Sequence, residues 1–332
     1  MKRMTLISFV CLLVTRVSAQ DASSLYPDGT LKHWQPRYAE NLRWNFENVV
    51  RPMLRSSERL NLAEVQLHFP LKAEREVGLF AFYSTPQADP PVVAMPVLSI
   101  KFFDDLCVAN AWLEENDYEL GTVTDYVAML KYLPSGSFPG GRYLPPLAAL
   151  QIPANALDNP RVDSLSQKLL KSGLLWVLIH ELAHVRYKHP GYDEVSADQA
   201  QQQETEADRF ATEIMRRIGV APVGVAQFFT IATYLWPNRA DFTSDVAWQI
   251  YLENTPHPLT TARLRTLTTD LRANLESFAR GEPNPEAVRT VISSMEGLAP
   301  ILAEEDMQRY IKKRALDVAG QPDPLRPRPK EK

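Results

Sequence analysis

The alternation of hydrophobic and polar positions predicts a mixed N-terminal half. Arg43 to Leu60 carries apolar residues at helical spacing. Val65 to Phe69, Val77 to Tyr83 and Val92 to Phe103 are short β-rich runs separated by proline and charged residues, so they predict a small sheet. Leu147 to Ile152 is a candidate for one more strand.

Helical spacing also appears after the predicted sheet. Asp104 is a candidate cap for a helix from Asp105 to about Asn116, and Thr122 for one from Val123 to about Tyr132. The segment from Pro134 to Pro146 is rich in proline and glycine and predicts a loop.

The pattern beyond residue 160 is mainly helical, although Gly173 could bend or break the first of these helices. The predicted helices are about Leu165–Tyr187, Gln199–Arg217, Pro222–Tyr234, Thr260–Arg280, Pro285–Met295 and Ala303–Ala319. Residues 321–332 are rich in proline and charge and predict a disordered tail. The expected fold class is α+β, mainly helical, with a small β-sheet in the N-terminal half.

The first residues have the pattern of a signal peptide. Lys2 and Arg3 precede an apolar run from Thr5 to Val14, and small residues before Gln20 predict cleavage after Ala19. The alternative is an uncleaved anchor, which the run is too short to form because a bilayer requires about 20 residues. We therefore expect an exported protein, periplasmic in preference to secreted, without a transmembrane segment in the mature chain.

Composition and charge narrow the class of protein. The chain is 45% hydrophobic and 23% charged, which is typical of a globular protein. Cleavage after residue 19 would remove three basic residues and no acidic one, so the net charge of −4 would become −7. This argues against nucleic acid as a partner. Cys107 would then be the only cysteine, and we interpret it as a buried small residue.

The main candidate for chemistry is the HExxH segment at residues 180–184. On a helix, His180 and His184 lie on one face and can direct both imidazoles at one metal ion. Glu181 would face the same cavity and act on a metal-bound water. The alternative is two histidines on a core helix by chance. His189, after the predicted helix end, is interpreted as a complement to the helix dipole.

A second acidic segment follows about twenty residues later. Glu204 and Asp208 are four residues apart and share a helix face, so Glu204 could be a third ligand while Asp208 accepts a hydrogen bond from a ligand histidine. Glu206 points elsewhere by about half a turn and is less favoured as a ligand. The alternative is a solvated acidic helix start.

These motifs together resemble gluzincin metallopeptidases of the HtpX and CAAX prenyl protease type. The resemblance covers roughly residues 165–267, from the HELAH segment through Glu-x-Glu-Ala-Asp-Arg to the His-Pro and arginine of residues 255–264. It implies a zincin-type core with one Zn²⁺ per chain, held by His180, His184 and Glu204, and Glu181 as the catalytic glutamate.

The resemblance also implies roles for three further residues. Asp208 would support a ligand histidine, Arg263 would be a structural or site-lining residue, and His257 would gate the metal or stabilise the transition state. Integral members of that family have membrane helices, whereas this chain has none after its predicted signal. The implied substrate is a polypeptide, with misfolded envelope proteins as candidates.

The predicted organisation is a signal peptide at 1–19, an α+β region at 20–150, a metallopeptidase core at 151–280, helices at 281–320 and the tail at 321–332. The predicted function is a zinc endopeptidase in which Glu181 activates a zinc-bound water. Two alternatives stay open: a chaperone-like or binding factor that retains a latent zinc site, and a zinc hydrolase of cell-wall peptides.

Overall fold

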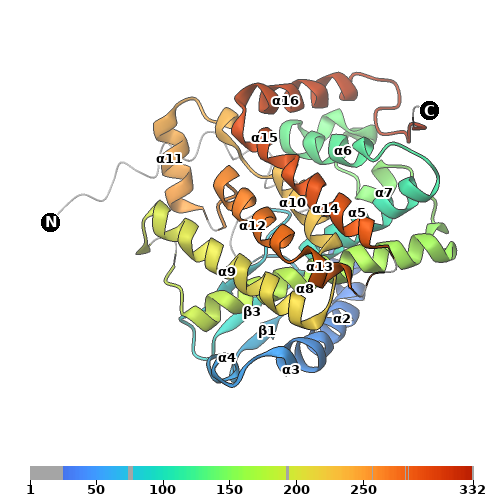
Figure 1. Ribbon diagram of the computed structural model, residues 1–332. Helices are drawn as coiled ribbons and strands as arrows, with labels where there is room; N and C mark the ends of the chain where they lie inside the picture. The colour runs from blue at the N-terminus through green and yellow to red at the C-terminus, as the bar shows by residue number, and fades with distance from the viewer. Residues whose placement is uncertain are drawn as a thin grey trace.

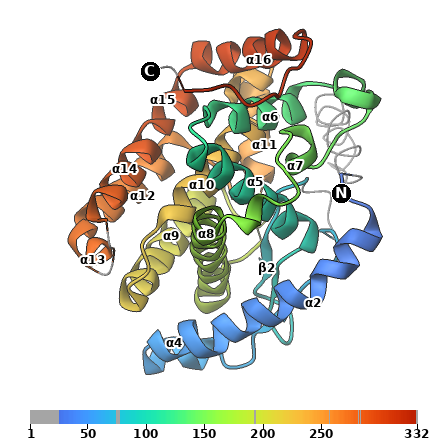
Figure 2. The same ribbon diagram turned by 90° about the vertical axis from the view of Figure 1, so that its right-hand side faces the viewer.

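A long helix, α8 (Pro160–Tyr187), lies at the centre of the fold. The computed structural model describes residues 25–73, 78–191, 194–255, 257–280, 282 and 284–330, so the predicted signal peptide lies outside the described residues. Proline at the first position and the Asn159 side chain, which accepts a hydrogen bond from the Arg161 amide, begin α8. Figure 2 looks along this helix and shows its neighbours around it.

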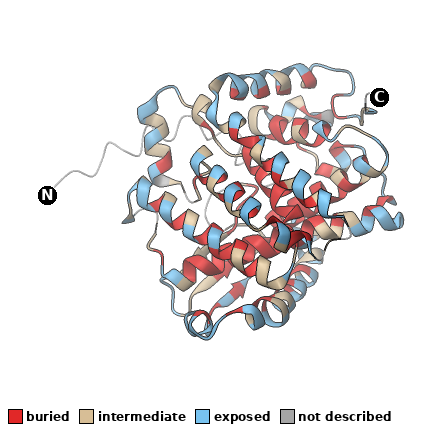
Figure 3. Cartoon of the chain, viewed as in Figure 1, coloured by how far each residue is buried: buried red, intermediate tan, exposed pale blue. Residues whose placement is uncertain are grey.

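Three helices pack against α8 and bury it on several sides: α5 (Val97–Glu115), α9 (Ala197–Ile218) and α10 (Val223–Leu235). Buried residues accordingly concentrate along α8 and its neighbours (Figure 3). Residues 169–185 of α8 are buried almost without interruption. The apolar sequence before the HExxH segment is therefore explained by burial against three partners at once.

Glycines allow α8 and α10 to cross at very short range. A Cβ atom on Gly224 would lie 1.9 Å from the Leu169 carbonyl oxygen, and one on Gly173 would lie 2.6 Å from the Phe103 ring. The Gly224 amide donates a hydrogen bond of 2.8 Å to Ser172 Oγ. The helix does not break at Gly173, because α8 continues through it, and the missing side chain serves packing.

The sheet is small and lies in the N-terminal half. Strands β1 (Gln66–His68), β2 (Tyr83–Thr85) and β3 (Val92–Ala94) form it in the order β1-β3-β2. β3 pairs in parallel with β1 and antiparallel with β2, and both registers place Val93 at the centre. This confirms the expected fold class, mainly helical α+β with a small sheet.

Two of the predicted strands are partly or wholly wrong. The run from Val92 to Phe103 leaves the sheet after Ala94, and Val97 begins α5. Because α5 is buried nearly all round, its β-branched and aromatic residues pack against the neighbouring elements and do not indicate a strand. Leu147 to Ile152 is not a strand either, because the short helix α7 (Pro146–Ala149) occupies it.

Two further boundaries differ from the prediction. In the described part of the run from Val77 to Tyr83, the strand begins only at Tyr83. Asp104 does not cap a helix, since it lies inside α5. Its carboxylate accepts a hydrogen bond of 2.6 Å from Tyr38, and the next residue, Asp105, accepts one of 2.7 Å from Tyr26. These contacts tie α5 to the N-terminal helix α2 (Asp28–Asn45), which carries Tyr38, and to the segment just before it, which carries Tyr26.

The remaining elements enclose the centre. After α2 come a π-helical turn (Phe46–Val50), α3 (Arg51–Met53) and α4 (Ser56–Asn61). The helical spacing of residues 43–60 is thus confirmed except at Leu54 and Arg55. Short 3-10 turns occur at Ser135–Ser137, Pro139–Gly141, Ala156–Asp158 and Arg239–Asp241. The other helices are α6 (Gly121–Tyr132), α11 (Asp245–Asn254), α12 (Thr261–Ala273), α13 (Leu275–Ala279), α14 (Pro285–Glu296), α15 (Leu298–Ala303) and α16 (Glu305–Ala319).

The tail beyond α16 differs from the predicted disorder over its described residues. Leu325 is buried, and the Lys330 amide donates a hydrogen bond of 2.8 Å to the Asp117 carbonyl. Arg328 lies 2.6 Å from the buried Asp125 carboxylate on α6. Arg328, one of the charged residues on which the prediction of disorder rested, therefore pairs with a buried acid. Among the described residues, no helix is long and apolar enough to span a membrane.

Candidate metal centre

Helix α8 presents three polar side chains inside the hydrophobic core. His180, Glu181 and His184 are each no more than 3% exposed. The helical spacing brings the two histidines together, so that His180 Nε2 and His184 Nε2 lie 3.1 Å apart.

Helix α9 brings its acidic residues to the same point. A Ser196–Gln199 capping box begins α9, and Gly219 ends it in the left-handed conformation. The fully buried Glu204 carboxylate lies 3.4 Å from His180 Nε2 and 3.3 Å from His184 Nε2. Asp208, one turn later, lies 2.9 Å from the other ring nitrogen of His180. The structure thus brings both predicted acids to the histidines, in the places expected for them.

The loop before α12 adds His257. Its Nδ1 atom lies 3.0 Å from Glu204 Oε1 and 3.4 Å from His180 Nε2, while its Nε2 atom lies 3.3 Å from Glu181 Oε1. The backbone at His257 has a φ of 55°, in the left-handed region that costs a non-glycine residue about 1–2 kcal/mol. The surrounding contacts must therefore outweigh this strain to hold the ring in place.

Arg263, in the first turn of α12, joins the two acids. Its guanidinium makes two hydrogen bonds of 2.8 Å with Asp208 and approaches Glu204 to 2.6 Å through Nη1. Thr260 caps this helix and orients the turn that carries Arg263. All seven site residues predicted from the sequence are thus brought together.

Four of these residues could hold a metal ion. One ligand atom from each of His180, His184, Glu204 and His257 lies within 4.8 Å of the others. Ligands that share a tetrahedral zinc at about 2.1 Å lie roughly 3.4 Å apart. The separations of 3.0–3.4 Å between neighbouring donor atoms match this spacing.

The buried charges favour a divalent cation. With neutral histidines, the buried carboxylates of Glu181, Glu204 and Asp208 face one buried guanidinium, Arg263, and this leaves two negative charges. Buried charge without a partner is strongly unfavourable. In addition, Glu181 Oε2 is buried and has no hydrogen-bond partner among the described residues. The donor set and the charge therefore both fit a dication.

The electrostatics of the ligands follow from burial and from neighbouring charges. Burial alone would raise the pKa of Glu204, but Arg263 and His257 hold it well below its ordinary range. Burial lowers the pKa of His184 to about 4. Burial also opposes protonation of His180, but the carboxylates of Glu204 and Asp208 outweigh it and raise the pKa of His180 to about 9.

Two residues that the sequence interpretation set aside lie beside the site. His189 Nδ1 is 2.9 Å from His184 Nδ1, and His189 Nε2 is 3.1 Å from Glu206 Oε2. The dipole interpretation missed these contacts because the chain turns back after α8 at Lys188, which has a left-handed conformation. The available signal was a third histidine shortly after the HExxH segment.

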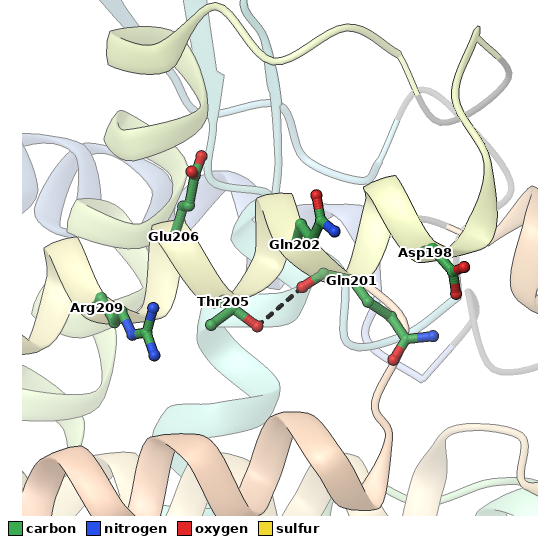
Figure 4. A pocket seen from close by; sticks show the side chains of 6 residues that line it. All are labelled: Asp198, Gln201, Gln202, Thr205, Glu206 and Arg209. Atoms are coloured by element: carbon green, nitrogen blue, oxygen red, sulfur yellow. Dashed lines mark hydrogen bonds between the residues drawn. The ribbon is translucent and has the colours of Figure 1, made fainter.

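A polar hollow lies beside α9. Figure 4 shows the side chains that line it: Asp198, Gln201, Gln202, Thr205, Glu206 and Arg209. Glu206 thus belongs both to this surface and to the contacts around His184.

A buried cluster of histidines and acids on two packed helices, able to hold a metal ion, is the kind of site found in hydrolytic enzymes. Residues 148–281 match a family model described as Peptidase U49. The match covers less than half of the chain but includes every residue of the candidate site, and it supports a peptidase family. Comparisons with curated proteins and with solved structures give no match.

Proposed function

We propose that this chain is a zinc-dependent endopeptidase. The observation that carries the proposal is a set of four donors, three buried and one half-buried, beside a carboxylate oxygen of Glu181 that has no partner among the described residues, within the segment that matches a peptidase family. His180, His184 and Glu204 would hold the zinc, with His257 as a fourth donor. A bound zinc ion supplies Lewis acidity, which polarises a peptide carbonyl and lowers the pKa of water toward neutrality.

Glu181 is the residue suited to proton transfer. It is adjacent to His180 on α8, 2% exposed, and its Oε2 atom has no partner among the described residues. Such a carboxylate can take a proton from an attacking water and return it to the leaving amine. A purely structural metal site has no need of this group, which argues against the binding-factor alternative.

His257 could act as a fourth metal ligand or stabilise an oxyanion, and the position of its Nδ1 atom favours the role of ligand. Its Nδ1 atom lies among the ligand atoms, so the ring would complete the donor set and keep the site latent. Its Nε2 atom, near Glu181, would instead be the one to stabilise an oxyanion. Since Glu181 and Glu204 are almost fully buried, a peptide would reach them only after a movement of the surrounding residues, and the half-buried His257 is the donor nearest to solvent.

The narrower identity rests on sequence. The order of the three motifs supports a gluzincin of the HtpX and CAAX prenyl protease type, and the N-terminal pattern supports export to the periplasm. Exported or envelope proteins, misfolded ones included, are then the proposed substrates.

Glu181→Gln tests the proposal directly. Purified wild type and variant should each contain about one zinc per chain, and only the wild type should cleave an unfolded protein such as casein. Glu253→Gln, an exposed change on α11, is the matched control and should cleave normally. A Glu181→Gln protein that cleaves at the wild-type rate contradicts the role of Glu181. Wild-type protein without a metal contradicts the zinc site.

A further inference from the structure

Outside the HExxH motif, a chain of contacts from His184 through His189 to Glu206 supports the His184 ring. We call this chain of contacts the His184 relay. His184 directs Nε2 toward the donor cluster, 3.1 Å from His180 Nε2 and 3.3 Å from Glu204 Oε1. Its other nitrogen, Nδ1, therefore faces away, and it lies 2.9 Å from His189 Nδ1. A ligand histidine ordinarily has its distal nitrogen fixed by such a contact, usually from a carboxylate or a carbonyl.

The fold places His189 for this contact through its backbone. Lys188 adopts φ 54° and ψ 43°, which turns the chain back on the end of α8. The His189 amide then donates a hydrogen bond of 3.0 Å to the His184 carbonyl, so the two residues are joined by main chain and by side chain. The His189 ring is 6% exposed and stacks on Tyr187, with ring centroids 5.4 Å apart. Its orientation is therefore fixed on several sides.

The order of donors and acceptors along the relay can be deduced from its outer end. Glu206 is a carboxylate and only accepts, so the His189 Nε2 atom, at 3.1 Å, carries the proton. In a neutral imidazole the other nitrogen then has the lone pair. His189 Nδ1 consequently accepts a hydrogen bond from His184 Nδ1–H, and the lone pair of His184 is left on Nε2, which faces the donor cluster.

From this geometry we infer that His189 and Glu206 are positioning residues that fix the tautomer of His184 for metal binding. The inference rests on the proposed function. It gives His184 a support parallel to that of His180, whose distal nitrogen meets Asp208. The two supports differ in exposure, because Glu206 is 57% exposed while Asp208 is buried. The His184 relay thus reaches the hollow beside α9, whereas that of His180 ends in the core.

The first experiment compares the zinc affinity of full-length variants by competition with a chelator. His189→Leu fills the volume without an acceptor, and His189→Asn places an amide oxygen near the former Nδ1 position. We expect His189→Leu to weaken zinc binding on the order of 10- to 100-fold, the usual cost of losing such a support. His189→Asn should recover a large part of this loss.

Glu206→Gln tests the outer end of the relay with little risk to folding, since the side chain is largely exposed. Glutamine both donates and accepts, so it no longer fixes the His189 tautomer. Asp198→Asn is the matched control, because it removes one carboxylate from the same hollow (Figure 4) and leaves Glu206, the partner of His189, in place. We expect several-fold weaker zinc binding for Glu206→Gln and unchanged binding for Asp198→Asn.

A spectroscopic readout separates tautomer control from general structural support. The chain has six histidines, so histidine-selective ¹⁵N labelling of the zinc-loaded protein gives few signals. The Nδ1 proton of His184 should appear far downfield in the wild type and move upfield in His189→Leu. Unchanged zinc affinity and an unchanged Nδ1 proton in His189→Leu overturn the relay. Wild-type protein that binds no zinc overturns the proposed function instead.

Discussion

Arg263 Nη1 lies 2.6 Å from Glu204 Oε2, and neither side chain is more than 4% exposed. The same guanidinium holds Asp208 through two further hydrogen bonds. One cation from α12 thus restrains two acids of α9, one of which is a candidate metal ligand and the other the partner of His180.

Arg263→Ala should destabilise the protein strongly. Removal of one partner from a buried charge cluster costs about 3–5 kcal/mol, because the remaining carboxylates stay buried without compensation. Arg209→Ala is the control, since it breaks an exposed pair of 3.2 Å with Asp270 between the same two helices and should cost at most about 1 kcal/mol. Chemical denaturation of both variants measures the difference. Equal losses would contradict the assigned importance of Arg263.

Removal of metal should lower the thermal stability of the wild type. With its histidines neutral, as metal ligands are, the site carries two buried negative charges in excess, and a ligand that binds only the folded state stabilises that state. The melting temperature should fall with a chelator and return with added zinc. The double variant His180→Ala/His184→Ala should be insensitive to both. A wild type whose melting temperature ignores chelator and zinc would exclude a metal at this site.

His257→Ala should increase peptidase activity. In the proposed latent state the ring occupies the fourth ligand position while α8 and α9 provide three ligands, so its loss should open that position without releasing the metal. The initial rate of casein cleavage and the zinc content measure the two effects. His68→Ala, an exposed histidine on β1, is the control. A lower rate at full zinc content would instead support the oxyanion role of His257.

Gly224→Ala should disrupt the crossing of α8 and α10. Its Cβ atom would lie 1.9 Å from a backbone oxygen, which side-chain movement cannot relieve. We expect a loss of at least about 3 kcal/mol, beyond ordinary overpacking. Gly29→Ala in α2 meets nothing within 4 Å and should be neutral or stabilising by up to about 1 kcal/mol. Unfolding curves that coincide for wild type and Gly224→Ala would refute the close contact.

The candidate site was predictable from sequence because its geometry is local. His180 with His184, and Glu204 with Asp208, are each related by one helical turn, so the helical period alone places each pair on one face. The contact of His189 with His184 was not predictable in this way. It depends on a left-handed turn at Lys188, a lysine whose type does not indicate that conformation.

The errors in the fold have a related cause. The sequence prediction distinguished strand from helix by residue preference and periodicity. The first half of α5 is buried on nearly every side, so its apolar run does not show helical periodicity, and only the second half was predicted as a helix. The described tail was misjudged because its arginine meets Asp125, about 200 residues earlier in the chain. Such pairings depend on tertiary structure, which composition alone does not report.

The contact between Gly173 and Gly224 also limits how the site can be redesigned. Gly173 precedes His180 by seven residues, which is about 10 Å along a helix axis. The position of the ligands along the axis of α8, relative to α10, is therefore fixed by the contact between the backbones of these two helices, two turns away from any ligand. A substitution of one ligand by another on α8 preserves this alignment only while both positions remain glycine. These two glycines are therefore a structural requirement of the metal site.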